Sequence, residues 1–242
     1  MKNAVIALFS VFLIISCSKK ESDKNLHITG NIKGLQEGKL YIQKIVDTNL
    51  VVIDSIMIDG QSTFESHIDL ESPEMFYLSL DRGATNSLDN HLPFFVEPGT
   101  INIETDLKHF FAEAKITGSK NQKLYEDYKK VNARFINQNL ELSKERFDAI
   151  RFNRPADVPA IEEKIAGNLK RKYLYAINFA ITNKEYDVAP YIALSEISDA
   201  NMKYLDTINN SLPEKIAKNK YGALLTKYIA NRKLEESKST AE

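Results

Sequence analysis

The sequence contains a single cysteine, Cys17, and no tryptophan among its 242 residues. One cysteine excludes an intrachain disulfide, a Cys-x-x-Cys redox pair and a cysteine-ligated zinc cluster. Nine glycines and seven prolines are too few for a collagen, a flexible linker or a low-complexity chain. Lysine and arginine (32) nearly balance aspartate and glutamate (33), so the formal charge of −1 creates no global attraction for nucleic acid. With 43% hydrophobic residues, the composition is that of a globular protein.

Residues 1–16 have the pattern of a lipoprotein signal peptide. Lys2 provides the positive start, and residues 4–15 form an uncharged apolar segment. This segment is too short for a permanent membrane-spanning helix, which needs about 20 residues. The segment Ile14-Ile15-Ser16-Cys17 resembles the bacterial lipobox. That resemblance implies cleavage before Cys17 and acylation of its thiol and amine, which would anchor the protein to a membrane.

Residues 17–24 are expected to form a solvated tether after the lipid attachment site. In the usual sorting pattern, an aspartate directly after the cysteine favours retention in the inner membrane. This chain has Ser18 at that position. By resemblance to that pattern, we expect a lipid-anchored protein of the cell envelope, in the outer membrane. The alternative is a plain apolar start with a chance cysteine, although the chain's one cysteine lies where the lipobox requires it.

Residues 25–118 have the alternating pattern of β-strands. Turn signals such as Asp59-Gly60 and Glu97-Pro98-Gly99 separate apolar runs that recur every 8–15 residues. The run Met75-Phe76-Tyr77-Leu78-Ser79-Leu80 is rich in β-forming residues. About eight strands at this spacing predict an antiparallel β-sandwich or barrel.

Residues 119–235 change to the helical period. Leu124, Tyr128, Val131 and Phe135 would share one helix face, which the later Phe147, Ile150 and Phe152 extend; a second row is Ile161, Ile165, Leu169, Tyr173 and Ile177. Ser119 and Gln122 fit a capping box, and Asp187 and Asp199 are expected to cap later helices. We therefore predict an α+β protein with an antiparallel β domain (25–118), a helical bundle (119–235) and a disordered tail (236–242).

The strand region resembles a module of unknown function in Gram-negative envelope lipoproteins. In those proteins the module usually precedes a thioredoxin-like domain of thiol:disulfide interchange proteins of the ResA/TlpA kind. The helices after Ser119 resemble the region that joins the two in longer relatives. The matching residues are Ile28-Thr29-Gly30, Ile32, Gly34, Gly38-Lys39-Leu40-Tyr41-Ile42, Asp54-Ser55, Asp59-Gly60, Phe64, Phe94-Phe95-Val96-Glu97-Pro98-Gly99, Ile101, Thr117-Gly118-Ser119 and Asn121.

The chain departs from these relatives because it lacks the thioredoxin domain's Trp-Cys-x-x-Cys segment. Disulfide exchange requires a thiolate that attacks a sulfur atom, and Cys17 is expected to carry lipid. Redox activity is therefore not implied by the resemblance. The motifs that match are turns and strand residues, which specify a fold more than an activity.

Other residues give no pattern of a catalytic or cofactor site. Phosphate-binding glycine loops and a nucleophile elbow are missing. His27, His67, His91 and His109 have no short ligand spacing, so a metal site would need the fold to bring His27 and His67 together. The remaining candidates are expected to be ordinary surface or core: the neighbours Glu162-Glu163, the basic runs Lys129-Lys130 and Lys170-Arg171-Lys172, and the tyrosines of the helical half.

Three functional hypotheses follow. The first is a non-catalytic, membrane-anchored binding or scaffold lipoprotein, without a metal, a cofactor or nucleic acid as partner. The second is an accessory subunit of a separate thioredoxin-like envelope protein, which an exposed apolar patch near the chain end would favour. The third is an enzyme whose site is assembled across the fold, which a deep polar pocket with convergent titratable groups would favour.

Overall fold

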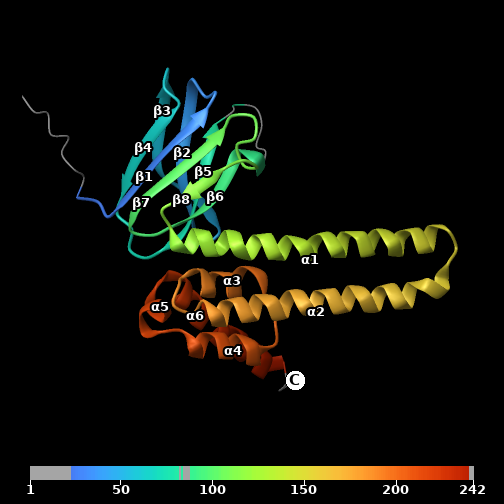
Figure 1. Ribbon diagram of the computed structural model, residues 1–242. Helices are drawn as coiled ribbons and strands as arrows, with labels where there is room; N and C mark the ends of the chain where they lie inside the picture. Colours follow the sequence, from blue (N-terminus) through green and yellow to red (C-terminus); the bar gives the residue numbers. More distant parts are fainter. Residues whose placement is uncertain (1–22, 82, 84–87, 240–242) are drawn as a thin grey trace, which may run out of the picture.

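The computed structural model describes residues 23–81, 83 and 88–239. The predicted signal peptide (1–16), Cys17 and most of the tether lie outside the described residues. Two four-stranded sheets are followed by a helical region, so the α+β prediction is confirmed (Figure 1). The strands are β1 (Leu26–Lys33), β2 (Glu37–Val46), β3 (Asn49–Asp59), β4 (Thr63–Ile68), β5 (Glu74–Asp81), β6 (His91–Val96), β7 (Gly99–Asp106) and β8 (Lys115–Thr117). The α-helices are α1 (Lys120–Arg151), α2 (Val158–Thr182), α3 (Val188–Glu196), α4 (Met202–Ser211), α5 (Glu214–Lys218) and α6 (Lys220–Ser239).

The two sheets pack face to face as a sandwich. One sheet has the strand order β4-β1-β7-β8 and the other β3-β2-β5-β6. Alternate residues of both sheets, including Ile28, Ile103, Ile42 and Phe94, form one buried core between them. The sheets are antiparallel with one exception, because β7 runs parallel to β1. The turn after β6 carries the chain across to the other sheet, where the Gly99 N–H bonds to the Asn25 carbonyl and sets this parallel register.

Strands β5 and β6 are buried on both faces. Phe76 and Phe94 point into the sandwich, whereas Met75 and Phe95 belong to the core that the helices form. This two-sided burial explains why large apolar and aromatic residues lie on both faces of β5 between Met75 and Leu80, with Ser79 as the one small polar residue, since a strand covered on both faces needs no polar alternation. The helical region thus packs against the outer face of one sheet.

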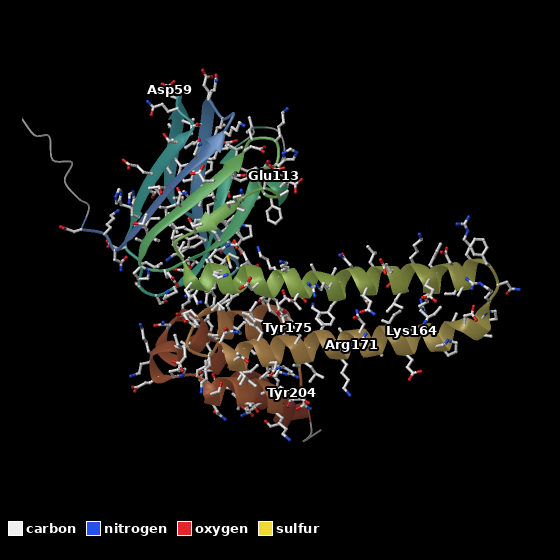
Figure 2. All side chains as sticks on the ribbon, viewed as in Figure 1. Asp59, Glu113, Lys164, Arg171, Tyr175 and Tyr204 are labelled. Atoms are coloured by element: carbon white, nitrogen blue, oxygen red, sulfur yellow. The ribbon has the colours of Figure 1, made fainter. Side chains whose placement is uncertain are left out.

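Helices α1 and α2 are antiparallel neighbours, and their distal halves extend past the sandwich and the other helices (Figure 1). Figure 2 labels Lys164 and Arg171 on the α2 side of this extension. The apolar face that Phe147, Ile150 and Phe152 were expected to extend is not buried there, because each of these residues is more than half exposed. Their face has no packing partner within the described chain, since α3–α6 cover the proximal part of the pair (Figure 1). Leu169 of the predicted α2 row is also half exposed.

The structure corrects three details of the helix ends. Asn201, not Asp199, caps α4, because its side chain accepts the Lys203 N–H. Asp187 precedes α3 without a side-chain capping bond. Helix α6 continues to Ser239, past the residue 235 at which the helical region was predicted to end, and the Arg232–Glu236 ion pair lies in this last part. None of the described helices is long and apolar enough to cross a membrane.

Candidate functional site

A polar joint fixes the start of α1 on the β-sandwich. The Glu97 carboxylate accepts the Lys120 N–H at 2.6 Å and the Asn121 N–H at 3.3 Å. Ser119 accepts the Gln122 N–H, as the predicted capping box requires, but the Gln122 amide oxygen accepts the Phe95 N–H of β6 instead of closing the box. The sequence indicated only a turn at Glu97, whereas the structure uses its carboxylate as a helix cap.

Asn121 extends this joint to the remaining helices. Its side-chain oxygen accepts the Val188 N–H at the start of α3, a bond across 67 positions. Asp187, the residue before Val188, accepts an N–H from the Asn219 side chain at 2.8 Å. Asn219 lies between α5 and α6. Burial raises the pKa of the Asp187 carboxyl above its ordinary value. The sheet, α1, α3 and the junction of α5 and α6 are therefore held at a defined spacing.

A cleft of about 900 Å³ lies where β2 and β5 meet α3, α5 and α6. One wall is apolar and aromatic: Met75 and Tyr77 from β5, Tyr191 from α3, and Tyr221 and Leu224 from α6. Tyr191 and Tyr221 are in edge contact, with 5.0 Å between their ring centroids. These side chains make a preformed concave surface, because Asn121 holds the start of α3 and the Asp187–Asn219 bond holds the junction of α5 and α6.

The tyrosines of this wall are structural hydroxyls rather than acid–base groups. Burial raises the pKa values of Tyr77, Tyr191 and Tyr221, so all three are neutral at physiological pH. The Tyr221 hydroxyl accepts the Met75 N–H at 2.9 Å. Other tyrosines pack between helices, as expected: Tyr128 is fully buried and stacks on Tyr175, which Figure 2 labels on α2.

A cluster of two lysines and one glutamate lies at one end of the cleft. The Glu74 carboxylate is 6% exposed and pairs with Lys44, at 3.4 Å, and with Lys220. Lys220 also donates to the Ile45 carbonyl at 3.3 Å. Two ammonium groups thus share one carboxylate, which leaves a net positive charge beside the aromatic wall. Sequence reasoning missed this cluster, since its members come from β2, β5 and α6 and no local spacing relates them.

The fold does bring His27 and His67 together. They are directly opposite each other on β1 and β4, and their rings stack with 4.1 Å between centroids and 10° between planes. A metal ion binds an imidazole nitrogen in the plane of the ring, at about 2.0–2.1 Å. Two nearly parallel planes about 4 Å apart have no such point in common, so these rings in this arrangement cannot ligate one ion. The Nε2 atom of His27 lies 3.9 Å from the Glu65 carboxylate.

A second group of possible ligands comprises Asp106, His109 and Glu113, whose donor atoms lie within 4.8 Å of one another. One Asp106 oxygen accepts the N–H groups of Lys108 and His109 at 2.7 Å each, which holds the pKa of this carboxyl below its usual range. His109 and Glu113 are exposed, and Figure 2 shows Glu113 at the surface of the sandwich. The group is therefore a solvent-facing turn, and we assign no ion to it.

The remaining candidates of the sequence lie apart from the cleft. Glu162 and Glu163 are both exposed, and Glu162 pairs with Arg146 of α1 at 2.9 Å. Both basic runs are on α1 and α2, and Lys130, Lys170 and Arg171 are exposed. The structure thus combines none of these charges into one site.

Comparison with known families matches residues 26–125 to a domain of unknown function (DUF4369). The match covers all eight strands and the first turn of α1, including the joint residues Glu97, Asn121 and Gln122. The similarity to a β module of unknown function is therefore confirmed for this part of the chain. Searches of the curated proteins and of the solved structures found no match.

Proposed function

We propose that this protein is a lipid-anchored lipoprotein of the cell envelope, in the outer membrane, whose folded part binds an organic anion with an apolar body. The ligand would occupy the cleft between the β-sandwich and α3, α5 and α6. The observation that carries the proposal is the Lys44–Glu74–Lys220 cluster next to the tyrosine wall. Its net positive charge attracts an anionic group, while Tyr77, Tyr191 and Leu224 provide the apolar contact area that small-molecule sites use.

The cleft supports binding rather than catalysis. Ser195 is among its described lining residues, but no histidine or cysteine is, so the described lining offers no Ser–His or Cys–His pair. The buried glutamate is already neutralised by two lysines, and the tyrosine hydroxyls keep their protons. The anchor rests on the lipobox at Cys17, which is consistent with a domain that works at a membrane surface.

The experiment uses 8-anilinonaphthalene-1-sulfonate, an apolar aromatic anion, with the uncharged N-phenyl-1-naphthylamine as its matched probe. Calorimetry should show one saturable site for the anion and weaker binding of the uncharged probe. Leu224→Trp fills the cleft and should weaken anion binding about tenfold or more, because it removes the apolar contact area. Leu234→Trp is the control, since this exposed leucine lies on the same helix but does not line the cleft.

Lys44→Gln tests the charge, because it leaves a neutral Glu74–Lys220 pair. It should weaken binding of the anion while leaving the uncharged probe unaffected. Equal binding of both probes would overturn the role of the charged cluster. Binding that Leu224→Trp leaves unchanged would overturn the cleft as the site.

A further inference from the structure

The turn that joins β2 to β3 is flanked by exposed apolar side chains. We call residues 45–52 the hairpin end. Its apolar residues are each between 40% and 49% exposed: Ile45, Val46, Leu50, Val51 and Val52. Exposed apolar groups that gather in one place mark a contact with something other than water.

These apolar residues lie on both faces of the hairpin. In an antiparallel pair, residues opposite each other point to the same face, and neighbours along one strand point to opposite faces. Ile45 is opposite Leu50, whereas Lys44 is opposite Val51. Ile45 and Leu50 therefore share one face, and Val51 points to the other. A protein packed on one face would leave the other in water, whereas a fluid lipid phase surrounds both.

The chain enters the fold next to the hairpin end. Asn25 makes two hydrogen bonds with Leu70, each of 2.8 Å. Two residues after Leu70, the Ser72 hydroxyl accepts the Lys220 backbone N–H at 3.3 Å, and the Lys220 ammonium donates to the Ile45 carbonyl at 3.3 Å. One lysine thus bridges the segment that holds Asn25 and the hairpin end.

The proposed lipid anchor is close to this point along the chain. Cys17 is eight residues before Asn25, and eight residues span at most about 26–29 Å. The anchor therefore keeps Asn25 within this distance of the membrane, with the hairpin end beside it. The opposite end of β3, at Asp59, is ten residues further along the strand than Asn49, a distance of about 33 Å. Figure 2 labels Asp59 at the far end of the sandwich from the helices.

We propose that the hairpin end rests in the surface of the membrane to which the protein is anchored. Its aliphatic side chains lie among the lipid headgroups and the upper parts of the acyl chains, and the Asp47 carboxylate stays in the hydrated headgroup layer. The proposal rests on the lipid anchor of the proposed function. The anchor supplies the attachment, and because it holds the hairpin end close to the lipid, a small apolar contact is enough to orient the protein.

Fluorescence quenching tests the contact in the full lipidated chain, reconstituted in vesicles of phosphatidylethanolamine and phosphatidylglycerol. Val51→Cys receives an environment-sensitive dye, and a lipid with a nitroxide on its acyl chain should quench this dye. Gln61→Cys is the matched control, because Gln61 is exposed just beyond the opposite end of β3 and should not be quenched. Lipidation leaves Cys17 without a free thiol, and the unmodified chain shows whether it takes up any dye.

Flotation of the same vesicles separates this proposal from the anchor on which it rests. Protein that floats with the vesicles but is quenched equally at both positions, or not at Val51, would overturn the membrane contact and leave the anchor intact. Protein that does not float has no anchor, and the membrane contact fails with it.

An acidic substitution tests the apolar character of the contact. In the Val51→Cys background, Leu50→Glu should reduce quenching about threefold or more, because a carboxylate at the hairpin end favours water over lipid. Met57→Glu is the control, since Met57 is exposed on the same strand but lies outside the hairpin end. Circular dichroism of both variants should match that of the unmodified chain. Equal quenching in the two variants would contradict the contact at the hairpin end.

Discussion

The hydroxyl oxygen of Tyr221, at the start of α6, accepts the backbone N–H of Met75 at 2.9 Å. The pairing of β5 with β2 ends at Phe76, and Met75 is the next residue of β5 beyond it. The Tyr221 hydroxyl therefore accepts the Met75 N–H at the place where the β2 backbone no longer provides an acceptor. A helix residue 146 positions away thereby completes the hydrogen bonding of a strand. This bond holds α6 against the sheet and shapes the wall of the cleft.

Tyr221→Phe should lower the free energy of unfolding by about 1–3 kcal/mol, because it leaves the buried Met75 N–H without an acceptor. Tyr128→Phe is the matched control. The Tyr128 hydroxyl is buried and has no hydrogen-bond partner among the described residues, so its removal should be neutral or stabilising. Urea denaturation of a soluble chain that begins at Ser18 measures both. Equal destabilisation by the two changes would contradict the structural role of the Tyr221–Met75 bond.

Gly118→Ala should destabilise the protein by about 2 kcal/mol or more. Gly118 has a φ angle of 100°, and a Cβ atom there would lie 2.0 Å from the Thr100 carbonyl oxygen. Gly167→Ala is the control, because this glycine is helical with open space around it. That change should stabilise by about 0.5–1 kcal/mol. Thermal unfolding followed by circular dichroism should move in opposite directions for the two variants.

Asp187→Asn should flatten the dependence of stability on pH. Burial raises the pKa of the folded-state carboxyl, so the folded chain holds this proton more firmly than the unfolded chain. The stability that Asp187 contributes is therefore fully present below its unfolded pKa and is lost as the pH rises through the folded one. Asparagine cannot ionise, and its side-chain oxygen can still accept from Asn219.

Urea denaturation at several pH values between 3 and 8 measures this effect. The Asn variant should be more stable than the unmodified chain at pH 7, and the difference should vanish at the acidic end. Asp127→Asn is the control, because Asp127 is exposed on α1. A difference between Asp187→Asn and the unmodified chain that is constant with pH would count against a buried ionisable carboxyl.

Cys17→Ala should prevent lipid attachment, because alanine has no thiol to acylate. The variant is expected to stay uncleaved at this site or to leave the membrane. Detergent-phase partitioning and incorporation of labelled palmitate test this, with Ser18→Ala as a control that keeps the thiol. Unchanged labelling and membrane retention of the Cys17 variant would rule out the lipobox.

The order of strands and helices could be predicted from local patterns in the sequence. Side chains alternate in strands such as β1, and they repeat every three to four residues along α1 and α2, because these periods follow from backbone geometry. The change of period near residue 118 accordingly falls between the end of β8 at Thr117 and the start of α1 at Lys120. Ser119 is the one helix cap that the sequence pattern located correctly, because its side chain bonds to the backbone N–H of a residue only three positions away.

The tertiary structure alone decided which distant residues meet. The parallel pairing of β1 with β7, the stacking of His27 on His67 and the Lys44–Glu74–Lys220 cluster join residues that no local spacing relates. It also decided that Phe147 and Ile150, apolar and correctly spaced for burial, have no partner in the described chain. A periodic pattern specifies that a face is apolar, but what covers that face depends on where the other elements pack.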